Sequence, residues 1–291
     1  MQEGTYQDIE LAPDKVITLE TGRLAKQADG AVVVSLGDTM VLCTAVISKS
    51  AREGQHFFPL TVDYREGFAS GGKIPGGFIK REGRSNDKEI LTSRLVDRAI
   101  RPLFPDGFRN EVQLICSVIS ADDENNGDML AGIGASAALL IAGAPFDGPI
   151  AEVRMGRVDG EFIVNPTLQE LEHSDFNLVV AGKLDAIVMV EGEMDEVSEE
   201  EMVEALEVAH EAIRELCEAQ LDLVDAFGAA APLEYETVVP PQDIVERVRG
   251  LVGQRIADHI RQPYDKATFY GGIRDIKEET LDRLLGVDDP E

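Results

Sequence analysis

Lysine and arginine side chains gather in one short segment, from Lys73 to Arg109, of a chain whose formal net charge is −28. The segment holds nine cations and five acidic residues, so its own charge is +4 and the rest of the chain carries −32. The cations are Lys73, Lys80, Arg81, Arg84, Lys88, Arg94, Arg98, Arg101 and Arg109. Because the remainder of the chain repels phosphates, we expect a phosphate-bearing ligand to bind in a channel or pocket at this segment.

Three of these arginines follow the spacing of one helix face. Arg94, Arg98 and Arg101 stand at i, i+4 and i+7. Guanidinium groups in such a row suit a phosphodiester backbone, since each presents a planar set of donors. The alternative is a solvated helix face, on which Asp97 pairs with Arg94 and Arg101 at helical spacing. The charge pattern alone leaves both interpretations open.

Local signals define the ends of this arginine helix. Asn86 can cap its first turn with Glu89 at the third helical position, and Pro102 ends it. The sequence therefore predicts a helix that starts after Asn86 and stops before Pro102.

A glycine-rich loop precedes the helix and surrounds Phe78, Ile79, Lys80 and Arg81. Its glycines are Gly71, Gly72, Gly76, Gly77 and Gly83. Such a loop can bring its backbone close to a ligand and offer an aromatic face to a base. Because the glycines leave many backbone states open, we expect the loop to be mobile without its ligand and ordered by it.

Composition limits the class of protein. With 291 residues and 44% hydrophobic content, the chain can bury a substantial core and form two or more units. Its acidity argues against nonspecific duplex binding and against attachment to anionic membranes. Cys43, Cys116 and Cys217 lie in apolar runs without metal or redox spacing, which predicts buried thiols. Neither a secretory signal nor a run of membrane-spanning length is found, which favours a cytoplasmic protein without membrane contact.

Short runs rich in valine and isoleucine, separated by turn residues, predict two sets of strands. They are Lys15 to Glu20, Ala31 to Leu36, Met40 to Ile47, Phe58 to Tyr64 and Val112 to Ile119, followed by Ile150 to Met155, Glu161 to Val164, Phe176 to Ala181 and Ala186 to Glu191. The fold class is therefore α+β, with mixed sheets packed against helices and an all-helical segment at the end.

Helices are predicted between and after these strands. Asp128 can cap a buried helix from Met129 to Ala142, in which Gly132 and Gly134 indicate close packing against backbone. A capping box at Ser198 starts a long amphipathic helix. A linker from Phe227 to Pro241 precedes two more helices, Ile244 to Ile260 and Lys277 to Leu285.

These elements suggest three parts. We expect a first subdomain at residues 1–146, a second at 147–228, and the start of a helical domain at 238–291, where the chain ends without a completed core.

The residues resemble the first ribonuclease PH-type core of the bacterial polynucleotide phosphorylase family. The match runs from about Thr18 into the helical segment, and the block from KIPGGF to RPLF is specific to it. The matching segments are GRLAKQADGAVVVSLGDTMVLCTAV, FFPLTVDYRE, KIPGGFIKREGR, RLVDRAIRPLF, GASAALLIAGAPFDGPI and NPT.

The resemblance implies an activity and an assembly. It implies a processive 3'-to-5' exoribonuclease that uses inorganic phosphate as co-substrate, releases nucleoside diphosphates and also runs in reverse as a polymerase. It implies a homotrimeric ring, single-stranded RNA as partner, and membership of an RNA-degradation complex. Mg²⁺ and the phosphorolytic centre belong to a second core in such proteins, so the resemblance assigns no catalytic and no metal-binding residue to this chain.

For this core the resemblance implies RNA handling. Phe78, Ile79, Lys80 and Arg81 match the loop that rings the RNA channel, and we add Arg84 to this RNA-binding set. The arginines that match phosphate-contacting positions are Arg94, Arg98 and Arg101. Ile79 and Lys80 depart from the commoner version with two aromatic residues and two arginines, which weakens stacking and removes one planar fork.

A degenerate phosphorolytic site is expected here. Gly134, Ala135 and Ser136 fall inside the buried helix, where a working ribonuclease PH domain has a phosphate-binding turn ahead of it. We also expect Asp185 to stand without basic neighbours. Two alternatives remain open, a noncatalytic ring scaffold that binds RNA and a self-sufficient small phosphorolytic ribonuclease. Nucleoside diphosphate release from poly(A), compared between this chain and one extended past Glu291, separates them.

Overall fold

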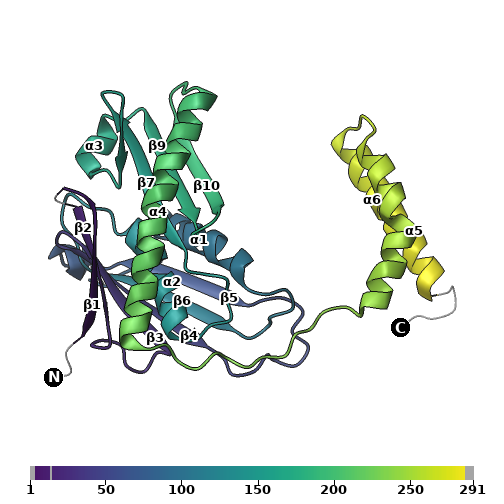
Figure 1. Ribbon diagram of the computed structural model, residues 1–291, viewed down its shortest axis with the longest axis horizontal. Helices are drawn as coiled ribbons and strands as arrows, with labels where there is room; N and C mark the ends of the chain where they lie inside the picture. Colours follow the sequence, from purple (N-terminus) through teal and green to yellow (C-terminus); the bar gives the residue numbers. More distant parts are fainter. Residues whose placement is uncertain (1–3, 14, 286–291) are drawn as a thin grey trace. The chain divides into compact units, whose positions relative to one another are not determined.

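The computed structural model describes residues 4–13 and 15–285. By their internal contacts they form two compact units, Met1–Thr237 and Val238–Glu291. Figure 1 shows sheets and helices in the first unit and a helical hairpin in the second. The two units do not test the predicted boundary between residues 146 and 147, which stays a prediction.

A six-stranded sheet with strand order β1-β2-β3-β4-β6-β5 forms one layer of the first unit. Its strands are β1 (Thr5–Ala12), β2 (Lys15–Thr21), β3 (Gly30–Leu36), β4 (Thr39–Ile47), β5 (Leu60–Glu66) and β6 (Val112–Ser120). All neighbours are antiparallel except β5 and β6, which are parallel. β5 is thus an edge strand, with one row of backbone groups that no strand pairs.

A four-stranded antiparallel sheet with order β10-β9-β7-β8 forms the second layer. Its strands are β7 (Ala151–Val158), β8 (Glu161–Val164), β9 (Phe176–Gly182) and β10 (Ile187–Met194). The short helix α3 (Leu168–Glu172) lies between β8 and β9 in the chain. β10 is the edge of this sheet, and its residues 190–193 are exposed.

The buried helix α2 (Asp128–Ile141) packs against strands of both sheets. The prediction of close packing is confirmed, but the neighbours of its glycines are side chains rather than backbone. A Cβ on Gly132 would lie 2.4 Å from Glu152 Cδ, and one on Gly134 would lie 2.6 Å from Cys43 Sγ. The backbone contact occurs instead at Gly30 of β3, where a Cβ would lie 1.9 Å from the α2 carbonyl of Ala138. These contacts hold α2 against the strands at van der Waals distance.

The predicted cap of α2 is wrong. Gly127 occupies the N-cap position and makes no side-chain cap, while Asp128 is the first helical residue. The Asp128 carboxylate instead binds a residue distant in the sequence: Arg154 Nη2 of β7 donates to it at 2.7 Å. A buried ion pair between the layers takes the place of a local cap.

The long helix α4 (Glu199–Phe227) starts as predicted, with a capping box between Ser198 and Glu201. It packs against β1, β7 and α2, as seen in Figure 1. The segment after it is not a free linker along its whole length. Ala230 N donates to Ile141 O at 2.8 Å and Leu233 N donates to Gly143 O at 3.0 Å, so this stretch is held on the first unit.

Among the strands and α-helices, the sequence patterns missed β1 and α3 and shortened one helix of the second unit. β1 was not predicted, because polar residues alternate along this edge strand and leave only Ile9 buried. In the second unit α5 (Gln242–Ile260) agrees with the prediction, but α6 (Lys266–Leu285) begins 11 residues before the predicted Lys277. Within the described residues, none of the helices has the length and apolar composition that crossing a membrane requires.

All three cysteines are free and buried, which confirms the predicted burial. Glu152 is the unexpected buried group: it is 1% exposed, and neither of its carboxyl oxygens has a hydrogen-bond partner among the described residues. Loss of hydration and, to a smaller extent, the charge of Asp128 raise its pKa to about 8, although Arg154 opposes both effects.

Replacing this carboxyl with an amide should change how stability depends on pH. A glutamate with the ordinary pKa of 4.5 ionises in the unfolded chain, whereas the folded state keeps the proton until about pH 8. The stability due to the protonated group is therefore complete below 4.5 and lost as pH rises to about 8. Glu152→Gln should raise the free energy of urea unfolding at about pH 8, relative to its effect at about pH 5, by a few kcal/mol. An equal effect at both pH values would contradict this assignment.

Candidate nucleic-acid interface

The arginine helix is formed as predicted. α1 (Asp87–Ile100) begins with a capping box in which Asn86 accepts from Glu89 N and Glu89 accepts from Asn86 N, both at 2.8 Å. The 3-10 turn η2 (Arg101–Leu103) follows it directly and contains Pro102. Local capping and a proline thus fix where the helix starts and stops.

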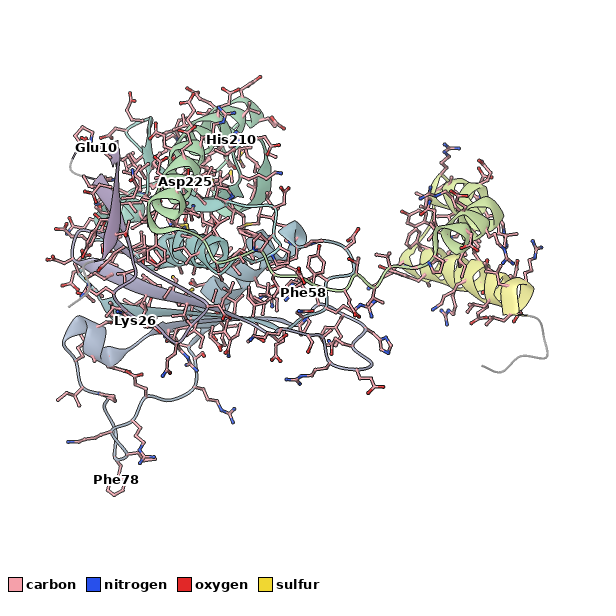
Figure 2. The ribbon with its side chains drawn as sticks, turned by 60° about the horizontal axis from the view of Figure 1, so that its bottom comes forward. Glu10, Lys26, Phe58, Phe78, His210 and Asp225 are labelled. Carbon is pink, nitrogen blue, oxygen red and sulfur yellow. The ribbon has the colours of Figure 1, made fainter. Side chains whose placement is uncertain are left out.

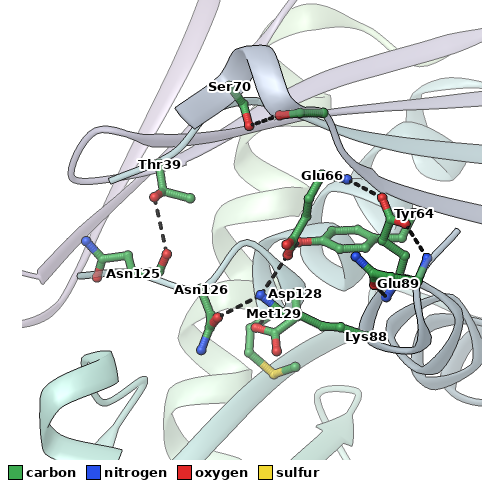
Figure 3. A network of polar contacts seen from close by, with 12 residues as sticks. Thr39, Tyr64, Glu66, Ser70, Lys88, Glu89, Asn125, Asn126, Asp128 and Met129 are labelled. Carbon is green, nitrogen blue, oxygen red and sulfur yellow. Dashed lines mark hydrogen bonds and ion pairs between the residues drawn. The ribbon is translucent and has the colours of Figure 1, made fainter. Parts of the chain in front are cut away.

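Side chains of α1 bind the free edge of β5. Tyr64 N donates to Ser93 Oγ at 2.9 Å. Glu66 N donates to Glu89 Oε1 at 2.9 Å (Figure 3). Glu89 therefore caps its own helix and pairs the edge strand at the same time. These bonds fix which face of α1 is turned away from the sheet, because the opposite face holds the strand.

Arg101 completes this edge. Its Nη1 and Nη2 donate to the carbonyls of Phe58 and Leu60 at 3.1 and 3.2 Å. Its Nε and Nη2 also bind both carboxylate oxygens of Asp97, at 2.8 and 2.6 Å. All its donor nitrogens thus have protein acceptors, and the guanidinium lies 5.6 Å from the centre of the Phe58 ring.

Arg94 and Arg98 line one side of a groove of about 510 Å³ on α1. The groove is lined by Val62, Asp63, Ser85, Ile90, Ser93, Arg94, Asp97 and Arg98. Arg94 is exposed and has no hydrogen-bond or ion-pair partner within residues 4–13 and 15–285. Arg98 is held by an ion pair with Glu191 of β10.

The predicted arginine row therefore divides into three environments. Arg94 is unpaired, Arg98 is paired with Glu191 of the second sheet, and Arg101 is bound to the edge of the first. The alternative of local pairing holds for one arginine only, since Asp97 binds Arg101 and not Arg94. The phosphate-contacting role of the row stays a prediction.

The glycine-rich loop projects from the first unit, with Phe78 at its tip (Figure 2). The Phe78 side chain is 103% exposed, and Ile79 is 74% exposed. In the part of the chain that the structure describes, the loop cations have no acidic partner and are exposed to solvent. They are Lys73, Lys80, Arg81 and Arg84.

The base of the loop is tied to the body. The turn η1 (Phe68–Gly71) is bound through Ala121 N, which donates to Ser70 O at 3.1 Å, and Phe68 N donates to Glu82 Oε1 at 2.7 Å. Farther out, Gly77 and Lys80 have positive φ of 75° and 49°. Only glycine adopts such a conformation without strain, so the tip turns sharply at Gly77.

The remaining cations of the segment are bound to protein groups. Lys88 pairs with Glu66 at 2.8 Å and reaches Asn126 at 3.3 Å (Figure 3). Arg109 Nη1 donates to Gln55 O at 2.5 Å. These contacts separate the structural cations from the loop cations and Arg94.

The place of the expected degenerate site is closed by packing. Gly134, Ala135 and Ser136 lie inside α2 as predicted, and Ser136 Oγ accepts from Ile150 N at 2.9 Å. The expectation for Asp185 is corrected, because Lys183 Nζ lies 3.4 Å from its carboxylate. The sequence offered this neighbour, because Lys183 stands only two positions before Asp185 in the turn between β9 and β10.

A second groove, of about 750 Å³, lies between α1 and the edge strand β10. Its acidic members are Asp128, already bound to Arg154, and Glu191 and Glu193. Among the described residues, no three histidine, cysteine or acidic side chains gather as metal ligands. The residues present thus do not fit a magnesium centre, and no step below depends on one.

The sequence matches the 3' exoribonuclease family in two parts, its domain 1 at residues 14–145 and its domain 2 at residues 148–212. Polyribonucleotide nucleotidyltransferases are among its relatives. The chain is 61% identical over 284 residues to that of Salinibacter ruber, which covers 98% of this chain and 40% of the relative. It is 49% identical to that of Syntrophotalea carbinolica, over 96% of this chain and 40% of the relative.

The fold has a solved counterpart. The crystal structure of rice (Oryza sativa) Rrp46 aligns with a TM-score of 0.58 and 16% identity, over 71% of this chain and 94% of the rice chain. This likeness confirms the predicted α+β fold of the ribonuclease PH type. The chain spans about 40% of the length of the relatives it matches.

The unequal environments of the arginines should appear as unequal stability. Arg101→Ala removes charged hydrogen bonds to the edge strand from a partly exposed side chain, so we expect a loss of about 1 to 3 kcal/mol in the free energy of unfolding. Arg94→Ala, the matched change on the same helix, should alter it by less than about 0.5 kcal/mol. Urea unfolding of both variants measures this, and equal losses would show that Arg101 does not hold the edge.

Proposed function

Because the chain belongs to the 3' exoribonuclease family, we propose that it binds single-stranded RNA and guides its 3' end within a phosphate-dependent exoribonuclease. In that role the whole protein cleaves RNA from the 3' end with inorganic phosphate, releases nucleoside diphosphates and can run in reverse. Phosphorolysis itself takes place outside this core, which contributes RNA contacts and no catalytic residue. Its RNA substrates are cytoplasmic.

The observation that carries the proposal is the exposed tip of the glycine-rich loop. Phe78 is 103% exposed, and Lys80 and Arg81 beside it have no acidic partner in the described chain. A fully exposed phenylalanine buries nothing in the fold, whereas stacking on a base removes its ring from water. Unpaired cations on either side can neutralise the phosphates of the same nucleotides.

Arg94 and Arg98 extend this contact along α1. Both line the groove of about 510 Å³, and Arg94 offers a free planar fork to a phosphate. We propose that Arg84 contacts RNA between the glycine-rich loop and α1. Arg101 stays in the predicted phosphate-contacting set. To bind RNA, however, it must break hydrogen bonds to Asp97 or to the carbonyls of Phe58 and Leu60. The binding path is thus set by the unpaired cations.

The proposed assembly is a homotrimeric ring in which three copies of Phe78 surround one RNA strand. Outside the basic segment the chain carries −32, so the outer surface repels RNA and confines it to the ring. Membership of a larger RNA-degradation complex belongs to the same proposal. In this assembly the loop is mobile without RNA and ordered when a base stacks on Phe78.

Phe78→Ala and Arg94→Ala should each weaken binding of a labelled oligo(A). Base stacking contributes about 1 to 3 kcal/mol, so loss of the ring should raise Kd by about fivefold or more. Loss of one charged contact should raise it by about tenfold. Fluorescence anisotropy at constant salt measures both.

The controls are matched by residue type. Phe57 is a phenylalanine that is 68% exposed outside the basic segment, and Arg247 is an exposed arginine of α5. Phe57→Ala and Arg247→Ala should leave Kd within about twofold of the original value. Equal effects of target and control variants, or no effect of either target, would refute the proposed RNA path.

A further inference from the structure

Arg94 and Arg98 lie one helical turn apart on α1, yet only one of them is free. Both are exposed and both line the same groove. Arg94 has no partner among the described residues, whereas Arg98 Nη1 binds Glu191 Oε2. The difference between them is therefore the carboxylate of Glu191.

Glu191 reaches Arg98 from the other layer of the first unit. It belongs to β10, the edge of the four-stranded sheet, whereas α1 is bound to β5 of the six-stranded sheet. Arg98 lines the groove that it shares with Arg94, and Glu191 lines the second groove on α1. Their ion pair thus links the two grooves and the two sheets.

Another anion can replace Glu191 in its ion pair with Arg98. A carboxylate presents acceptor oxygens to a guanidinium much as a phosphate does. The side chains of Arg98 and Glu191 are 46% and 48% exposed, so water and salt screen their attraction. An RNA phosphate can therefore take the place of Glu191, but until it does the charge of Arg98 is neutralised.

We propose that Glu191 competes with RNA phosphate for Arg98 and so regulates the affinity of the arginine groove for single-stranded RNA. Arg98 then joins the interface only when a strand already held by the loop and Arg94 brings a phosphate to it. This inference rests on the proposed function, because it assumes that RNA follows α1. It gives Glu191, an acidic residue of the edge strand β10, a role in regulating the binding of a polyanion.

Glu193 provides the control within the same strand. It is exposed, lines the same groove as Glu191, and has no cationic partner among the described residues. Glu193→Gln removes the same charge as Glu191→Gln without releasing an arginine. A difference between the two variants therefore isolates the ion pair from general repulsion.

The experiment measures the Kd of a labelled oligo(A) by fluorescence anisotropy at constant salt for Glu191→Gln, Glu193→Gln, Arg98→Ala and the double variant Arg98→Ala with Glu191→Gln. Thermal unfolding of each variant checks that it is folded. Glu191→Gln should lower Kd by about two- to fivefold, and Glu193→Gln by clearly less. The double variant should bind no more tightly than Arg98→Ala alone, because the gain requires Arg98.

Each other outcome has a distinct meaning. Equal gains for the two glutamate variants, a gain that persists without Arg98, or no gain for Glu191→Gln while Arg98→Ala weakens binding would overturn the competition and leave the RNA path intact. No change on replacing either Arg94 or Arg98 would refute the proposed function, and the competition with it.

Discussion

The free edge of β5 is the constraint on which the rest of the interface depends. An edge strand presents unpaired N–H and C=O groups that must find partners or remain open to another chain. Here the N–H groups of Tyr64 and Glu66 bind side chains of α1, and the carbonyls of Phe58 and Leu60 bind Arg101. Side chains of α1 and of the following turn η2 thus bind both ends of this edge.

The attachment of α1 to this edge orients the arginines of the helix and the ends of the glycine-rich loop. Once Ser93 and Glu89 bind the strand, Arg94 and Arg98 line the groove that α1 forms with Val62 and Asp63 of β5. The same attachment fixes both ends of the glycine-rich loop, which leaves β5 through η1 and returns at Asn86. The tip that carries Phe78 therefore projects from a base that hydrogen bonds hold to the body of the first unit.

The sequence was informative at several places where the cause was local. The two predicted capping boxes, at Asn86 and Ser198, are confirmed, because each depends on residues three positions apart, whereas a third one, of Thr167 with Glu170, was missed. The ribonuclease PH resemblance is confirmed for the same reason, since its motifs are contiguous. The predicted RNA-binding and phosphate-binding residues stay predictions.

What the sequence could not provide lies in pairs that are distant along the chain. Arg98 and Glu191 are 93 positions apart, and Arg101 meets backbone carbonyls more than 40 positions away. Helical spacing placed Arg94, Arg98 and Arg101 in one row but could not show that two of them are already bound. Asp128 was misassigned likewise, because its carboxylate binds Arg154 of the strand β7. Only the fold separates free cations from bound ones.

The most direct test of the account is to map where RNA touches the protein. A single-stranded RNA with photoreactive bases, crosslinked to the chain and analysed by mass spectrometry of its peptides, reports every contact at once. The account predicts crosslinks in the loop around Phe78 and along α1 near Arg94, and none on the acidic helix α4. Crosslinks concentrated on α4, with the loop unmodified, would contradict it.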